Sequence, residues 1–197
     1  MMPKLDGFSV CKQIKNSAST NHIPIILLTA KASMEDKLKG LELGADAYLY
    51  KPFHQQELLI QIEQLIQQRK NLQAIFAKQL TSPQPSPAHL ENAFLKQVNQ
   101  IISDNIRKED VSHTLYKELA MSRSQVYRKI KALTDLSTTN YIKKVRIKKA
   151  YTVLSESSAS ISEIAYLVGF KDPAHFSRAF KNEYGVSPSS FRATLPS

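Results

Sequence analysis

A proline-rich stretch divides this chain of 197 residues into two segments of different character. Residues 81–89 read TSPQPSPAH, which places three prolines in five positions. Proline has no backbone N–H to donate and clashes with the preceding helical turn, so such a stretch fits neither a helix nor the interior of a sheet. We therefore predict a linker over residues 79–90, a first domain over residues 1–78 and a second domain over residues 91–197. The length suffices for two small domains that each bury a core.

The second segment carries most of the positive charge. The net charge is +10; residues 1–80 hold 10 Lys and Arg against 7 Asp and Glu, whereas residues 81–197 hold 17 against 10. Residues 121–150 alone contain nine cations and a single anion, Asp135. A run of charge is usually only a solvated surface, so a polyanionic partner needs independent support from motifs.

Several functional classes lack support in the sequence. No window approaches the roughly 20 apolar residues of a membrane span, and no signal peptide is recognisable, so we expect a cytoplasmic protein without membrane contact. Cys11 is the single cysteine and has no neighbouring ligand cluster, which favours a plain buried or half-buried thiol. His175 likewise lacks a second metal ligand. Without a nucleophile elbow, a phosphate-cradling glycine loop or paired histidine ligands, we expect no metal site and no enzyme.

The first segment alternates between helical and strand patterns. DGFSVCKQIKN indicates a helix with Asp6 near its start, IPIILLT a buried strand, the stretch from Ser33 to Gly44 a capped helix, and DAYLYK a second strand. A long amphipathic helix follows, beginning near QQELL. Such alternation implies a parallel sheet with crossover helices, and the sites of such sheets lie at the carboxyl ends of the strands.

Thr29 and Lys51 stand at those two carboxyl ends. A hydroxyl supplies one hydrogen bond and an ammonium group supplies a point charge, a combination that suits a phosphoryl group. The two strand ends therefore predict a phosphate pocket.

The motifs MMPKLDG, LLTA and GADAYLYKPF resemble the last three fifths of a response regulator receiver domain from two-component signalling. The resemblance implies that Thr29 is the switch hydroxyl, Lys51 the phosphate-binding lysine before a proline often preceded by a cis bond, and Tyr48 the aromatic switch. It also implies an α/β partial receiver with a truncated doubly wound parallel sheet. The first two strands, the acidic pair that holds Mg²⁺ and the phosphoacceptor aspartate would all precede Met1. We therefore expect no cofactor in this chain, and Mg²⁺ only in the intact receiver.

The absent acceptor leaves two interpretations of Asp6. It could substitute as a phosphoacceptor, but the preference of aspartate for helix N-caps favours a capping role. A sheet of two strands would also leave apolar faces and an edge uncovered. We therefore expect this half to be the less stable one alone, and the chain to be a fragment of a longer protein.

The second segment shows helical patterns only, and two of its stretches repeat one layout. In the first, Ser112 starts a helix, a short turn follows, and Ser122 caps a second helix. In the second, Ser162 starts a helix, Gly169 makes the turn, and Asp172 followed by proline opens the next helix. The repeat predicts two helix-turn-helix units in tandem.

The motifs LAMSRSQVYRKIK, VRIKKAYTVL and ISEIAYLVGFKDPAHFSRAFKNEYGVSPSSFR lie between residues 110 and 192 and resemble the DNA-binding domain of AraC-type transcription activators. The resemblance implies an all-α domain of seven helices. A long helix over roughly residues 140–155 would present two recognition helices to successive major grooves on one face of the DNA. Asp135 stands where the family usually has glycine, and aspartate tolerates the left-handed conformation of a helix end at some cost.

Helix geometry selects the side chains that would face DNA once the inward faces are fixed. They are Ser124, Gln125, Tyr127 and Arg128 on the first recognition helix, and Ala174, His175, Ser177, Arg178 and Lys181 on the second. Arg128 and Arg178 are the strongest candidates for base or phosphate contact; the alternative is that each pairs with an acid of its own domain. Phosphate contacts without sequence choice are expected from Lys143, Lys144, Lys148 and Lys149.

By these resemblances the chain is the output part of a response regulator, or of a hybrid sensor protein, and regulates transcription by sequence-specific binding to double-stranded DNA. A sensor histidine kinase, in the same full-length chain or another, would phosphorylate the intact receiver. Phosphorylation would change the pairing of protomers in a homodimer that recruits the transcription machinery. Two alternatives stay open: a phosphorylation-dependent protein interaction adaptor without specific DNA binding, and an enzyme that turns over its own aspartyl phosphate.

Overall fold

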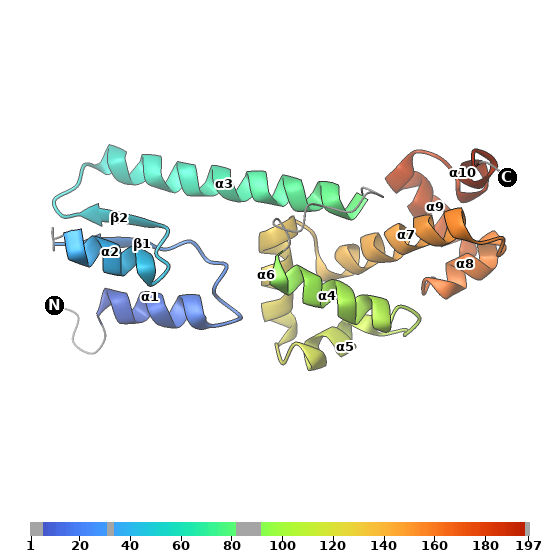
Figure 1. Cartoon of the computed structure of the whole chain (residues 1–197), viewed down its shortest axis with the longest axis horizontal. Helices are drawn as coiled ribbons and strands as arrows, with labels where there is room; N and C mark the ends of the chain where they lie inside the picture. The colour runs from blue at the N-terminus through green and yellow to red at the C-terminus, as the bar shows by residue number, and fades with distance from the viewer. Residues whose placement is uncertain (1–5, 31–33, 82–91, 196–197) are drawn as a thin grey trace. The chain divides into compact units, whose positions relative to one another are not determined.

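The computed structural model describes residues 6–30, 34–81 and 92–195 (Figure 1). Within these ranges, residues 34–37 and 77–81 are described by their backbone alone. The chain divides between Ala74 and Ile75 into two units. The predicted linker over residues 79–90 lies mostly outside the described residues. Its first three residues form the end of helix α3 (Gln55–Thr81). None of the described helices combines the length and the apolar character needed to cross a bilayer.

The first unit shows the predicted alternation of helices and strands. Its elements follow the order α1 (Gly7–Asn16), β1 (Ile26–Thr29), α2 (Met34–Glu42), β2 (Ala47–Tyr50) and the greater part of α3. The strands are parallel, and the register runs from Ile26 opposite Ala47 to Thr29 opposite Tyr50. Helix α2 connects the strands and packs on β2, and α1 packs on α2 (Figure 1). The described part of this unit is thus a single crossover with a two-stranded sheet.

Local chemistry explains where these helices begin and end. The carboxylate of Asp6 accepts a hydrogen bond from the amide of Ser9 at 2.7 Å and is the N-cap of α1. The capping role predicted for Asp6 is confirmed, since N-cap aspartate satisfies one of the orphan amides of a first helical turn. Gly44 follows α2 at φ +90, a conformation that favours glycine. Ser33, the predicted cap of α2, lies outside the described residues.

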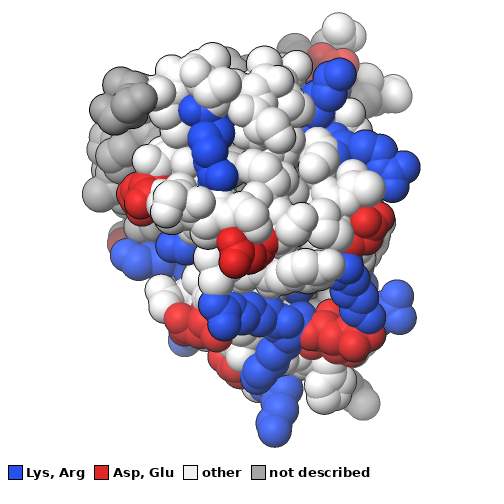
Figure 2. Space-filling model, turned by 90° about the vertical axis from the view of Figure 1, so that its right-hand side faces the viewer, with Lys and Arg blue, Asp and Glu red and all other residues white. Residues whose placement is uncertain are grey.

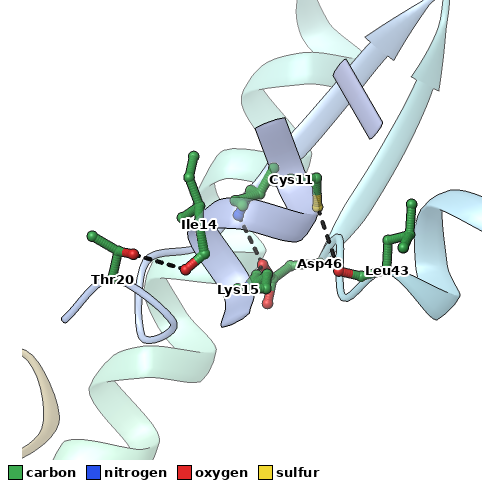
Figure 3. Close-up of polar contacts among 7 residues, drawn as sticks. Cys11, Ile14, Lys15, Thr20, Leu43 and Asp46 are labelled. Carbon is green, nitrogen blue, oxygen red and sulfur yellow. Dashed lines mark hydrogen bonds and ion pairs between the residues drawn. The ribbon is translucent and has the colours of Figure 1, made fainter. Parts of the chain in front are cut away.

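Side chains at the amino end of the sheet hold α1 to the turn before β2 (Figure 3). Asp46 accepts from the ammonium group of Lys15 and from the amide of Ile25, each at 2.7 Å. The Cys11 thiol is 1% exposed and lies 3.7 Å from the carbonyl oxygen of Leu43. Burial raises the pKa of Cys11, so the thiol is a packing group here, as predicted. These contacts brace the end of the sheet opposite to Thr29 and Lys51.

The second unit is entirely helical over residues 92–195 apart from its turns. Seven helices occupy this described range, the number implied by the sequence resemblance: α4 (Ala93–Asp104), α5 (Val111–Glu118), α6 (Arg123–Thr134), α7 (Thr138–Glu156), α8 (Ile161–Leu167), α9 (Pro173–Tyr184) and α10 (Pro188–Ala193). Helix α7 lies between α4–α6 on one side and α8–α10 on the other (Figure 1).

Two helix pairs, α5–α6 and α8–α9, repeat one backbone plan. The N-caps of α6 and α9 are Ser122 and Asp172, which are 50 residues apart. The residues that end these helices in the left-handed conformation, Asp135 at φ 60 and Gly185 at φ 79, are separated by the same interval. The predicted left-handed conformation of Asp135 is therefore confirmed.

The predicted starts of the first helix of each pair are wrong by two residues. The N-cap of α5 is Asp110, whose carboxylate accepts from the amide of His113 at 2.9 Å. The N-cap of α8 is Ser160, which forms a reciprocal capping box with Glu163. A capping box satisfies two orphan donors at once, so Ser160 is favoured over Ser162.

Helix α7 lines both hydrophobic cores of the second unit. The first core contains Val98, Ile102, Leu115, Val126 and Ile130, and α7 adds Tyr141, Ile142 and Val145. The second core contains Ile164, Phe176 and Phe180, and α7 adds Ile147, Ala150 and Leu154. Each recognition helix predicted from the sequence thus has its inward face in a different core, and α7 joins the two.

Candidate nucleic-acid interface and phosphate pocket

The two predicted pocket residues of the first unit lie side by side. The backbone amide of Lys51 donates to the carbonyl oxygen of Thr29 at 2.6 Å, directly after the last paired residues of the sheet. Lys51 is exposed, Thr29 is half-buried, and the peptide bond between Lys51 and Pro52 is cis. A hydroxyl and an ammonium group at adjacent strand ends form an arrangement that can bind an anion.

Tyr48 connects this sheet end to α2. Its half-buried ring lies 5.2 Å from the ring of Tyr50 in an edge-on arrangement. A Cβ atom at Gly40 of α2 would lie 3.0 Å from Cδ2 of Tyr48, so the glycine leaves the space that the ring needs. A change in the rotamer of Tyr48 would therefore alter the packing of α2.

In the second unit the two predicted arginines occupy equivalent positions. Arg128 and Arg178 each lie six residues after the N-cap of their helix. The Nε of Arg128 donates to the carbonyl of Ser124 at 3.3 Å, and the Nε of Arg178 donates to the carbonyl of Ala174 at 3.4 Å. Both side chains are exposed. Because these bonds use Nε, the terminal amino groups of each guanidinium are still available as donors in a bidentate geometry.

The other predicted contact residues differ in how far they can reach outward. Most are exposed: Ser124, Tyr127, Ala174, His175 and Lys181; Ser177 is half-buried. The side-chain oxygen of Gln125 accepts from the amide of Ser122 at 2.8 Å, so Gln125 is half-buried and belongs to the capping box of α6. The ring of His175 lies 5.6 Å from that of Phe170, which orients the imidazole on the second core.

The basic run over residues 121–150 serves internal structure as much as the surface. Lys129 is 4% exposed, its ammonium group lies 4.4 Å from the centre of the Phe94 ring, and burial lowers the pKa of Lys129. Lys144 pairs with Glu183 at 2.6 Å. Burial also lowers the pKa of Lys148. Four lysines were predicted to contact phosphates. Of these, Lys144 is engaged in the ion pair, Lys143 and Lys148 are half-buried, and Lys149 is exposed.

Two grooves flank the amino ends of α6 and α9. The first, of about 760 Å³, is lined by residues of α6 and the start of α7, among them Arg123, Tyr127 and Thr139. The second, of about 710 Å³, is lined by Arg107, Lys143 and Lys171 together with His175 and Thr139. Thr139 borders both grooves, so together they form one surface between α6 and α9.

This surface includes cations that the sequence prediction missed. Arg123 is the first residue of α6, Lys171 precedes the cap of α9, and Arg107 lies before α5. The sequence did contain a signal for Arg123 and Lys171, because each adjoins a predicted N-cap. Cations at the amino end of a recognition helix are well placed to contact a phosphate backbone. Figure 2, seen from the side on which α8–α10 lie in Figure 1, shows Lys and Arg side chains interspersed with Asp and Glu. In that view the positive charge is divided into several patches.

Both segments match models of known protein families. Residues 115–194 match the family model of a helix-turn-helix domain, and residues 1–63 match that of a response regulator receiver domain. The protein named Histidine kinase P4 of Formosa agariphila is 35% identical over 195 residues, which cover 98% of this chain and 14% of that protein. The Msm operon regulatory protein of Streptococcus mutans is 39% identical over 114 residues, 55% of this chain and 41% of that protein.

A solved structure is also similar. It is the C-terminal domain of AraT, a response regulator from Geobacillus stearothermophilus. The sequence identity is 30% and the TM-score is 0.48, and the match covers 54% of this chain and 89% of that chain. The chain spans less than half the length of the two curated relatives named above.

Proposed function

We propose that this chain, which joins a response regulator receiver segment to an AraC-type helix-turn-helix domain, binds specific double-stranded DNA sequences and regulates transcription as the output part of a two-component system. One observation carries the proposal. Arg128 and Arg178 are exposed at the same position of two capped helices that are 50 residues apart. Repetition of an exposed arginine on a repeated scaffold fits a ligand that itself repeats, as successive turns of a DNA duplex do.

In this proposal the two helix pairs are two helix-turn-helix units. Helices α6 and α9 are the recognition helices, and their amino ends enter successive major grooves. Ser124 and Tyr127 accompany Arg128 on α6, while Ala174, His175, Ser177 and Lys181 accompany Arg178 on α9. Arg123, Lys143 and Lys149 contact phosphates, which strengthens binding without choosing a sequence and makes the affinity depend on salt.

The first unit would couple this binding to phosphorylation. A doubly wound sheet completed by strands upstream of Met1 would supply the acceptor aspartate, and a sensor histidine kinase would phosphorylate it. Thr29 and Lys51 would bind the phosphoryl oxygens, and a rearrangement of Tyr48 would change the surface of α2 through its contact at Gly40. That change would shift the pairing of two protomers, which then recruit the transcription machinery.

Magnesium belongs to the intact receiver in this proposal. Mg²⁺ prefers carboxylate oxygens in an octahedral arrangement. Thr29 and Lys51 offer a hydroxyl and a cation, and the described residues contain no cluster of three or more His, Cys, Asp and Glu side chains that could hold a metal ion. In this proposal the ion is therefore assigned to none of the residues that the structure describes. Incubation with acetyl phosphate and Mg²⁺ should leave the chain without an acyl phosphate, and a stoichiometric label would contradict this assignment.

The decisive experiment is footprinting with salt titration on promoter DNA, followed by affinity measurements. Arg128→Ala and Arg178→Ala should each weaken specific binding by about 1–3 kcal/mol, or roughly 5- to 150-fold. The matched control is Lys131→Ala, which removes a cation from α6 that pairs with Asp135 at 2.8 Å. It should change the affinity by no more than a few-fold. No protected site, or equal effects of the three substitutions, would favour the alternative of a protein interaction adaptor.

A further inference from the structure

Arg146 occupies the boundary between the two cores of the second unit. Val145, immediately before it on α7, packs into the first core, and Ile147, immediately after it, packs into the second. The side chain of Arg146 points into neither core. It lines the 710 Å³ groove that also contains Arg107, Lys143 and His175.

The guanidinium of Arg146 binds the loop between α4 and α5. Its Nη2 donates to the carbonyl oxygen of Ile106 at 3.1 Å and to that of Lys108 at 3.0 Å. The side chain of Arg146 is half-buried, and this burial lowers the pKa of Arg146. Hydrogen bonds from a charged donor are stronger than neutral ones, and partial desolvation strengthens them further.

The turn between α8 and α9 meets the same atoms. Gly169 has φ +84, and a Cβ atom built on it would lie 2.0 Å from the carbonyl oxygen of Ile106 and 2.9 Å from Cζ of Arg146. No side chain can occupy that space. The backbone of the second helix pair therefore contacts both the loop before the first pair and the arginine of α7.

Two further contacts join the same elements. The side chain of Ile106, although it precedes α5, packs against the second core. Glu109 forms an exposed ion pair with Lys171, which lies just before α9. We call the set of Ile106, Glu109, Arg146, Gly169 and Lys171 the joint.

We propose that the joint fixes the separation and angle of α6 and α9, with Arg146 as a positioning residue that sets the spacing between the two DNA grooves that the protein can bind. This inference rests on the proposed function. Helices α6 and α9 both pack on α7, and a long helix can bend. A brace at the boundary of the two cores restricts the bending of α7 before DNA is bound. Once one of the two helices α6 and α9 has bound its groove, the other therefore needs no further ordering to bind the next groove.

The first test measures the geometry without DNA. In a Cys11→Ala background, spin labels on Lys131→Cys and Lys181→Cys report the distance between equivalent points of α6 and α9. The distance distribution should be narrow in the otherwise unaltered protein and clearly broader in Arg146→Met, which keeps much of the length but donates no hydrogen bond. Arg146→Lys keeps the charge and the aliphatic stem; it should broaden the distribution less and serves if Arg146→Met does not fold. Lys149→Met, an exposed cation on the same helix, should leave the distribution narrow.

The second test measures spacing on DNA with the full chain. Inserting one base pair between the two contacted grooves moves the second groove by about 3.4 Å along the duplex and rotates it. The unaltered protein should lose at least about tenfold in affinity, whereas Arg146→Met should lose no more than about threefold. Lys149→Met should bind more weakly to every site but retain the full penalty for the insertion.

The outcomes separate the two proposals. If the unaltered protein binds no specific DNA, the proposed function fails, and the labels alone still decide whether Arg146 holds the helices. If the protein binds DNA but Arg146→Met and Arg146→Lys retain a narrow distribution, or if Arg146→Met retains an undiminished penalty for the insertion, the inference about the joint is wrong.

Discussion

Replacement of Gly169 by alanine should destabilise the second unit far more than the same change at Gly185. Both glycines have a left-handed backbone, at φ +84 and φ +79. An L-residue in that conformation costs roughly 1–2 kcal/mol, and this cost applies to both substitutions. The two sites differ in their surroundings: a Cβ at Gly169 would lie 2.0 Å from the carbonyl oxygen of Ile106, whereas a Cβ at Gly185 would have no heavy atom within 4 Å.

The difference between the two variants gives the magnitude of the steric effect. A contact at 2.0 Å is far inside the separation of non-bonded atoms, and the neighbour is backbone, so the turn or the loop must move. Overpacking of this kind costs typically about 1–3 kcal/mol. We therefore expect a loss of about 1–2 kcal/mol for Gly185→Ala and of about 2–5 kcal/mol for Gly169→Ala.

Denaturation by urea, followed by far-ultraviolet circular dichroism, measures both changes. The chain contains no tryptophan, and the helical signal comes largely from the second unit. With a slope of about 1–3 kcal/mol per molar urea, the midpoint of Gly169→Ala should lie about 1 M below that of Gly185→Ala. Equal midpoints would refute the close approach of Gly169 to Ile106 and with it the geometry of the joint.

Four further predictions concern caps and burial. Asp135→Gly should raise stability by up to about 1 kcal/mol, because glycine adopts the left-handed end of α6 without strain; a lower denaturation midpoint would contradict this. Ser160→Ala should cost about 0.5–2 kcal/mol through loss of the α8 cap. Glu163 accepts the Ser160 amide hydrogen, which lowers the pKa of Glu163. The stabilisation from this hydrogen bond is present above the pKa that Glu163 has in the unfolded chain, and it is lost as the pH falls through the lower pKa of the folded protein. The free energy of unfolding of Glu163→Gln should therefore fall less steeply in acid than that of the unaltered protein. Cys11, 1% exposed with a pKa raised by burial, should react with a thiol reagent only when the first unit opens. Labelling at lower urea than the loss of helical signal would show that this unit is the less stable one, and coincident transitions would contradict it.

The sequence predicted the elements of both units well because their signals are local. Alternating apolar runs and helical periodicity indicated the order from α1 to α3. Asp6, Ser122 and Asp172 were recognised as caps because an N-cap side chain bonds amides two or three residues away. The strand ends at Thr29 and Lys51 followed from the rule for parallel sheets.

The errors have two different causes. The pattern Ser-x-x-Glu occurs at Ser160, so the true start of α8 was available in the sequence. The burial of Lys129 could not be predicted from the sequence, because it depends on the ring of Phe94, which α4 brings next to α6. A cation on a helix looks solvated until the fold supplies its neighbours.

Comparison of the two helix pairs indicates where the second unit opens most easily. In the second pair, glycine occupies both left-handed positions, Gly169 in the turn and Gly185 at the helix end. In the first pair, the corresponding residues are Ala120 at φ 49 and Asp135 at φ 60. At roughly 1–2 kcal/mol for each residue with a side chain, the first pair carries about 2–4 kcal/mol of local strain that the second lacks. The joint attaches the loop before α5 to the less strained second pair. In the proposed arrangement the brace at Arg146 would therefore act on the more strained pair, and the orientation of α6 would depend on the joint more than that of α9.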